Sequence, residues 1–196
     1  MLNLKMGFIV SSVLALLLSS VANAEVILDI EDVITTAGSN VSVDIIATTT
    51  TPGVELIGAD LPLDIGGDGL GVPTGLTFIG FSTEFSIPIG GGGPPSEDVL
   101  AGGATFGDPP TSLPSAIVTL DFAVDSGVAV GTVFDIDFLE TTFSGLNTLS
   151  VTDQNFVSTT PTAIDGSITI VAVPEPGSAA LMVAFGGLAL CRRRAR

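Results

Sequence analysis

The stretch SAIVTLDFAV, residues 115–124, alternates between two sets of side chains over its whole length. Successive side chains of a β-strand point to opposite faces, so every second residue shares a face. We expect one set to face a core: Val118, Leu120, Phe122 and Val124. The other set is Ile117, Thr119, Asp121 and Ala123. The segment is therefore predicted to be a strand with one buried face.

The same period of two recurs over residues 25–171, where no segment keeps helical spacing for three turns. In VFDIDFLE, residues 133–140, Phe134, Ile136 and Phe138 point one way, while Asp135, Asp137 and Glu140 are polar. Further runs are Val26–Ile30, Val41–Ala47, Val54–Ile65, Leu76–Ser82 and Ser167–Val171. This pattern predicts an all-β fold, an antiparallel β-sandwich. Residues 89–96 and 107–114 are expected to be surface loops, and 158–164 a flexible segment.

The charges of the 196-residue chain are segregated, with 21 acidic and five basic residues and a net charge of −16. All acidic residues lie between Glu25 and Glu175, and no Lys or Arg shares that span. A domain without cations cannot neutralise phosphates, which argues against nucleic-acid binding. The chain also lacks His, Tyr and Trp and has a single Cys. Disulfides within the chain and His-activated nucleophiles are therefore excluded.

The first 24 residues have the layout of a secretory signal peptide. Lys5 precedes an apolar run at residues 6–18, which is short for a spanning helix. Ala22 and Ala24 form an A-x-A site that predicts cleavage before Glu25, where the acidic residues begin. The alternatives are an uncleaved anchor or a buried helix.

The last 25 residues, 172–196, predict a membrane segment. Residues 177–191 carry no charge and as a transmembrane helix would span ~22 Å, short of the roughly 30 Å hydrocarbon core. The basic tail would stay in the cytoplasm and leave the domain outside. That tail consists of Arg192, Arg193, Arg194 and Arg196.

The order of elements in this tail resembles the PEP-CTERM sorting signal of bacterial exported proteins. That signal is a Pro-Glu-Pro segment, an apolar helix and a terminal arginine cluster; here the segment is Val173, Pro174, Glu175 and Pro176. The resemblance implies recognition by an exosortase, a membrane-embedded transpeptidase, and processing near Pro-Glu-Pro. A transient membrane anchor would then give way to a place on the cell surface or in the extracellular matrix. A plain tail anchor is the alternative.

The order of strands resembles the cohesin-like family of sandwich domains. The relevant segments are TAGSNVSVDIIA (36–47), LIGADLPLDI (56–65), LTFIGFS (76–82), AIVTLDFAV (116–124), GTVFDIDF (131–138) and the closing DGSITI (165–170). Ig-like and carbohydrate-binding sandwiches share much of this pattern. The resemblance implies contact with a protein or a polysaccharide across a sheet face, and it assigns no individual contact residue.

Two kinds of chemistry remain open for the domain. Asp135 and Asp137, about 7 Å apart along one strand face, meet the spacing of a two-carboxylate glycosidase. Calcium is the one cofactor considered, with candidate ligands Glu31, Asp32, Glu97, Asp98, Asp135 and Asp137. No catalytic residue is assigned. The leading hypothesis is a non-enzymatic surface or matrix protein, and the alternatives are an exported glycan hydrolase and a matrix filler.

Overall fold

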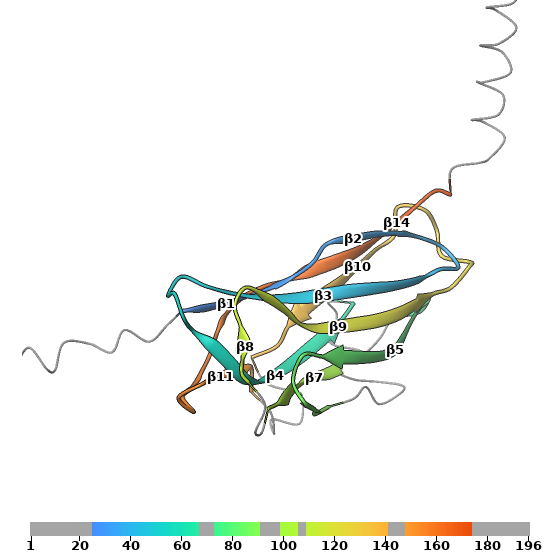
Figure 1. Cartoon of the computed structure of the whole chain (residues 1–196). Helices are drawn as coiled ribbons and strands as arrows, with labels where there is room; N and C mark the ends of the chain where they lie inside the picture. The colour runs from blue at the N-terminus through green and yellow to red at the C-terminus, as the bar shows by residue number, and fades with distance from the viewer. Residues whose placement is uncertain (1–24, 67–72, 91–98, 106–108, 141–147, 174–196) are drawn as a thin grey trace, which may run out of the picture.

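The computed structural model describes residues 25–66, 73–90, 99–105, 109–140 and 148–173, which form two packed β-sheets (Figure 1). The predicted signal peptide, the membrane helix and the basic tail lie outside these ranges. Within the described ranges no helix is long and apolar enough to cross a membrane.

The first sheet is five-stranded, in the order β13-β1-β3-β9-β5. Its strands are β1 (Val26–Ile30), β3 (Asn40–Thr49), β5 (Leu76–Thr83), β9 (Ser115–Val124) and β13 (Thr162–Ile164). The pairs β1·β3, β3·β9 and β5·β9 are antiparallel, and β1·β13 is parallel.

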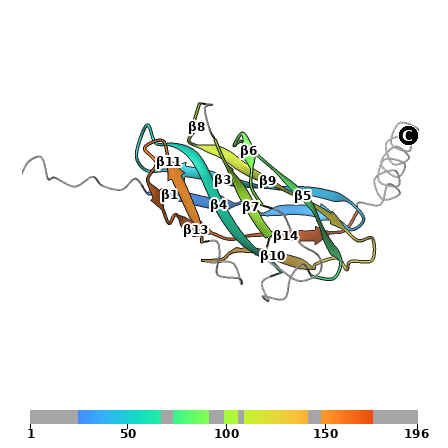
Figure 2. The same ribbon diagram turned by 90° about the horizontal axis from the view of Figure 1, so that it is seen from below.

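The second sheet is nine-stranded, with β12-β11-β4-β10-β14-β2 in order, β7 and β8 paired to β4, and β6 paired to β7. Its longer strands are β2 (Val33–Thr36), β4 (Glu55–Ile65), β7 (Val99–Ala104), β10 (Val133–Phe138), β11 (Ser150–Asp153) and β14 (Gly166–Val171). Three two-residue strands complete it: β6 (Ile87–Pro88), β8 (Thr111–Ser112) and β12 (Ser158–Thr159). Figure 2, which views the molecule of Figure 1 from below, shows β11, β4 and β7 side by side.

All seven strands predicted from periodicity are present, with ends within three residues of the expected positions. The expected flexible segment at 158–164 instead contributes β12 and β13, which pair with β11 and β1. β2, β7 and β11 were not predicted, because Gly-rich VLAGGA and the four-residue VITT and SVTD show too little alternation. The all-β sandwich is confirmed.

The expectation of a purely antiparallel sandwich is wrong at two places, where β1·β13 and β14·β2 are parallel. Near each end of the domain the chain passes from the five-stranded sheet to the nine-stranded sheet. The first passage is at Glu31–Asp32 between β1 and β2, and the second, beside it, is at Asp165 between β13 and β14. Gly166 permits this close approach, because an added Cβ would lie 2.5 Å from the carbonyl oxygen of Ile30. Both passages run in the same direction, so the strands on either side of them, β1 with β13 and β2 with β14, pair in parallel.

The core lies between the sheets and contains the set predicted from SAIVTLDFAV, since Val118, Leu120, Phe122 and Val124 are buried. The rings of Phe78 and Phe122 meet edge to face, 5.6 Å apart. Ile117 was expected on the opposite face and is also fully buried. The register of β3 against β9 shifts at this point, so Ile117 is the extra residue of a bulge and turns inward.

Candidate functional site

The outer face of the five-stranded sheet carries a ladder of hydroxyl–carboxylate pairs, which we call the β3–β9 ladder. Ser42 lies opposite Asp121 and donates a hydrogen bond of 2.6 Å to its Oδ1. Thr119 lies opposite Asp44 and donates a hydrogen bond of 2.6 Å to Asp44 Oδ1. Acid and hydroxyl thus alternate along each strand and across the pair. Each bond holds one carboxylate oxygen in place and leaves the other oxygen open to a further donor.

The strands beside the ladder continue this polar surface. Asp29 on β1 and Thr77 and Ser82 on β5 are exposed. Ile79, also exposed, is the extra residue of a bulge between Phe78 and Gly80. The described face is broad, acidic and without a cation, and small-molecule sites are concave. Such a face suits an extended contact with another macromolecule.

The predicted carboxylate pair lies on β10 in the other sheet, with Asp135 exposed and Asp137 half-buried. Phe134 and Ile136 between and beside them are buried, so the predicted face assignment is confirmed. Asp137 lies opposite the buried Asp64. Desolvation raises the pKa of Asp137, and the charges of Asp165, Asp135 and Asp64 raise it further.

The carboxylates around Asp137 do not assemble into a recognisable metal centre. In the described part of the chain, no group of three or more His, Cys, Asp or Glu could hold an ion. Asp165 Oδ1 accepts a 2.8 Å hydrogen bond from the backbone N–H of Phe138, and Asp32 Oδ1 accepts one of 2.8 Å from Ser167. Both carboxylates thus have local structural partners. The calcium candidates Glu97 and Asp98 lie outside the described residues.

Strand periodicity does not predict the turn that runs from Asp153 at the end of β11 to Ser158 at the start of β12, which we call the Phe156 turn. Phe156 has a left-handed backbone (φ 63°) and is 78% exposed. A bulky L-residue in this conformation costs about 1–2 kcal/mol. Asp153 holds the turn: its Oδ1 accepts from the backbone N–H groups of Asn155 (2.8 Å) and Val157 (2.9 Å). Its backbone carbonyl accepts from the Phe156 N–H at 3.0 Å.

The same hydrogen bonds affect the ionisation of Asp153. Partial burial opposes the charged form, but the bonds from Val157 and from the side chain and backbone of Asn155 outweigh it and lower the pKa of Asp153. Gln154 ties the turn to β4, since its N–H donates to the Glu55 carbonyl at 3.0 Å. Its side-chain Oε1 accepts from the Glu55 N–H at 2.9 Å. The exposed ring is therefore presented from a fixed support.

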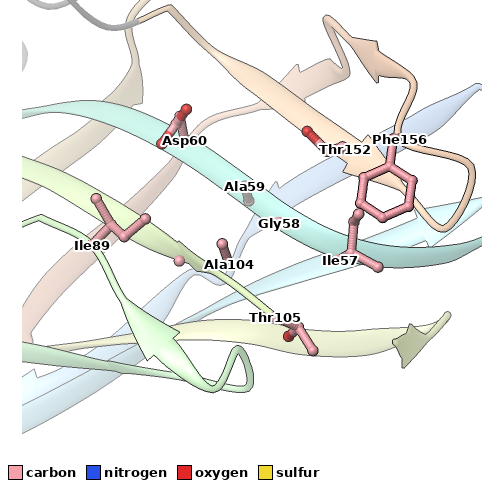
Figure 3. Close-up of a pocket in the computed structure, with 10 residues that line it drawn as sticks. Ile57, Gly58, Ala59, Asp60, Ile89, Ala104, Thr105, Thr152 and Phe156 are labelled. Carbon is pink, nitrogen blue, oxygen red and sulfur yellow. The ribbon is translucent and has the colours of Figure 1, made fainter. Parts of the chain in front are cut away.

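The Phe156 turn borders a pocket of about 210 Å³ on the outer face of the nine-stranded sheet (Figure 3). Its floor is a row of small side chains, because Ala104 of β7, Gly58 of β4 and Thr152 of β11 lie opposite one another. The Asp and Asn of DQNF are typical turn residues and could have indicated the turn. Nothing in the sequence marks the left-handed, exposed Phe156.

The predicted sorting and processing residues are largely untested by the structure. Val173 is 61% exposed at the end of the last described segment. The other residues of these predicted sites lie outside the described ranges: Ala22, Ala24, Pro174, Glu175, Pro176, Arg192, Arg193, Arg194 and Arg196. Their roles stay predictions.

Comparison with solved structures relates this sandwich to cohesin modules. A cohesin from Clostridium thermocellum OlpA, solved with a dockerin, matches with a TM-score of 0.60 at 12% identity over 75% of this chain and 99% of that chain. The sixth cohesin of Acetivibrio cellulolyticus scaffoldin B, also solved with a dockerin, gives 0.56 at 15% identity, with 74% and 99% covered. A non-cellulosomal cohesin from Archaeoglobus fulgidus gives 0.53 at 12% identity, with 76% and 93% covered.

These similarities establish the fold, which is the cohesin β-sandwich. No family model matches the sequence. No curated protein matches it either. The cohesin-like part of the sequence interpretation is thereby confirmed at the level of architecture.

Proposed function

We propose that this chain is an exported, non-enzymatic binding module that is sorted to the cell surface or matrix and contacts another protein through its five-stranded sheet. The observation that carries the binding proposal is the β3–β9 ladder, a sheet face that no other described segment covers and that carries regularly placed acceptor oxygens. A surface of this kind favours a partner that supplies donors or cations. Cohesins of the same architecture have been solved in complex with dockerin proteins, which supports a protein partner.

The export and sorting parts of the proposal are supported by the two chain ends. The A-x-A site at residues 22–24 immediately precedes the first described strand, and Val173 leads directly from the last strand into the Pro-Glu-Pro segment. All five basic residues lie at these ends, as expected when their charges set membrane topology. An exosortase-type transpeptidase would be the partner of the tail, and the sandwich would remain outside the cell.

The binding proposal is tested by charge reversal within the ladder. A double variant Asp44→Lys with Asp121→Lys in the full-length chain should lose the protein partner captured from the cell-surface fraction by the unmodified chain. The matched control is Asp135→Lys, an exposed acid on the other sheet, which should retain the partner. Equal capture by both variants would place the contact elsewhere.

A further inference from the structure

The pocket bordered by the Phe156 turn differs in chemistry along its length. Figure 3 shows Phe156 beside Ile57 at one end and Ile89 with Asp60 toward the other. The backbone agrees, because Asp60 lies opposite Gly102 and the Ile89 N–H bonds to the Gly102 carbonyl at 3.1 Å. One end is therefore aromatic and aliphatic, and the other combines an aliphatic wall with a carboxylate.

The carboxylate end lies within reach of one long side chain laid on the floor. Gly58 on the floor and Asp60 are two residues apart on β4, about 7 Å along a strand. A lysine or arginine side chain has an apolar stem of comparable length and a terminal cation. Among the described residues no hydrogen bond or ion pair occupies the Asp60 carboxylate, so it can accept from an incoming group.

The hollow itself depends on small residues that cannot be enlarged without displacing backbone. A Cβ on Gly103, which lines the pocket, would lie 2.7 Å from the carbonyl oxygen of Ile87. A Cβ on Gly58 would lie 3.1 Å from the carbonyl oxygen of Gly103. The floor is thus set by close packing of β4, β7 and β6. Phe156 keeps its left-handed conformation because the hydrogen bonds to Asp153 hold the turn, so the exposed ring stays at the edge of the pocket.

Charge decides between the ligands that could fill such a pocket. Residues 25–173 contain no Lys or Arg, so the potential around the domain attracts cations and repels acidic glycans. A neutral sugar could stack on Phe156 but would gain nothing from that potential. A lysine or arginine side chain gains from Asp60 at its cation and from the aromatic ring along its apolar stem.

We propose that this pocket binds a lysine or arginine side chain from a basic segment of a partner protein, with the apolar stem against Phe156 and along the small-residue floor and the cation at Asp60. The site is on the opposite sheet from the β3–β9 ladder and does not depend on the ladder being a contact surface. Failure of either proposal can therefore be recognised separately.

The test is a calorimetric titration of the full-length chain in detergent with a peptide of lysines separated by glycine and serine. A peptide with norleucine in place of lysine, which keeps the four-carbon stem and lacks the ammonium group, serves as the apolar probe. Asp60→Asn should weaken binding of the lysine peptide about fivefold. Asp29→Asn, which removes an exposed charge from the other sheet, should weaken it less than about twofold.

Phe156→Gly separates binding from folding. Glycine adopts a positive φ freely, so this variant should fold at least as stably while losing the ring and about fivefold in affinity. Equal effects of Asp60→Asn and Asp29→Asn would show diffuse attraction and overturn the proposal. The proposal would also be overturned if the norleucine peptide bound as tightly as the lysine peptide, or if no binding of the lysine peptide could be measured. Displacement of the lysine peptide by a neutral oligosaccharide, or self-association of the chain that blocks this peptide, would overturn it as well.

Discussion

Ser42 and Asp121 lie opposite each other on β3 and β9, and the Ser42 hydroxyl donates a 2.6 Å hydrogen bond to Asp121 Oδ1. Both side chains lie on the outer face of the sheet, so the bond buries little surface. A double-mutant cycle with Ser42→Ala and Asp121→Ala should give a coupling free energy of about 0.5–1 kcal/mol, measured by chemical unfolding. Ser42→Ala combined with Asp137→Asn, on opposite sheets, should be additive.

Gly166 should tolerate no side chain. A Cβ would lie 2.5 Å from the Ile30 carbonyl oxygen, where the two chain crossings meet. Gly166→Ala should lower the free energy of unfolding by about 2 kcal/mol or more, because backbone must move. Gly127→Ala is the control, since nothing lies within 4 Å of its added Cβ, and it should change stability by no more than about 0.5 kcal/mol. Equal effects would show that the crossings are not in contact.

Asp137 should make the free energy of unfolding of the domain larger at acidic pH than it would be without this carboxylate's raised pKa. Its folded-state pKa is raised, so its contribution to stability is fully present below the unfolded pKa and is lost as pH rises through the folded pKa. Asp137→Asn should therefore stabilise the protein at neutral pH and flatten the dependence of the unfolding midpoint on pH in the acidic range.

The same variant examines the hydrolase alternative. A raised pKa is what a general acid requires, and Asp135 lies on the same strand face. We expect no glycan turnover by the unmodified chain, measured by release of reducing sugar from a broad panel. Turnover that is abolished by Asp137→Asn or Asp135→Asn would replace the binding account with a catalytic one.

The sorting signal has a cellular test. Replacing Pro174, Glu175 and Pro176 with alanine should leave a larger precursor in the membrane fraction, because the processing enzyme would no longer recognise its substrate. Immunoblots of membrane, surface and medium fractions measure this. Alanine replacement of Asp125, Ser126 and Gly127, an exposed turn of the domain, is the control for a triple alanine substitution outside the motif. If the Pro-Glu-Pro variant had the same size and location as the unmodified chain, the plain tail anchor would be favoured.

The strong alternation of the longer strands made the sandwich predictable, as in SAIVTLDFAV and VFDIDF. The extra residue Ile117 could not be placed, because a bulge is decided by pairing with another strand and not by local pattern. Parallel pairing of the two ends also depends on tertiary contact, although Gly166 in the closing DGSITI segment is the residue that permits it.

The candidate surfaces were predictable only in part. The acidic, cation-free character of the domain followed from composition, and the outward direction of Thr119 and Asp121 followed from the pleat. Their pairing with Asp44 and Ser42 needed the register of β3 against β9. The Phe156 pocket could not be predicted from local pattern. It is formed by three strands far apart in sequence, a two-residue edge strand and a backbone conformation that phenylalanine rarely adopts.

The most direct test of the account is site-specific photo-crosslinking of the full-length chain in the cells that produce it. A photoreactive residue at position 42 or 119 lies on the β3–β9 ladder, and one at position 135 lies on the other sheet. The account predicts one discrete protein adduct from positions 42 and 119, recovered outside the cytoplasm and absent from position 135. No adduct from the ladder positions, or the same adducts from all three, would contradict it.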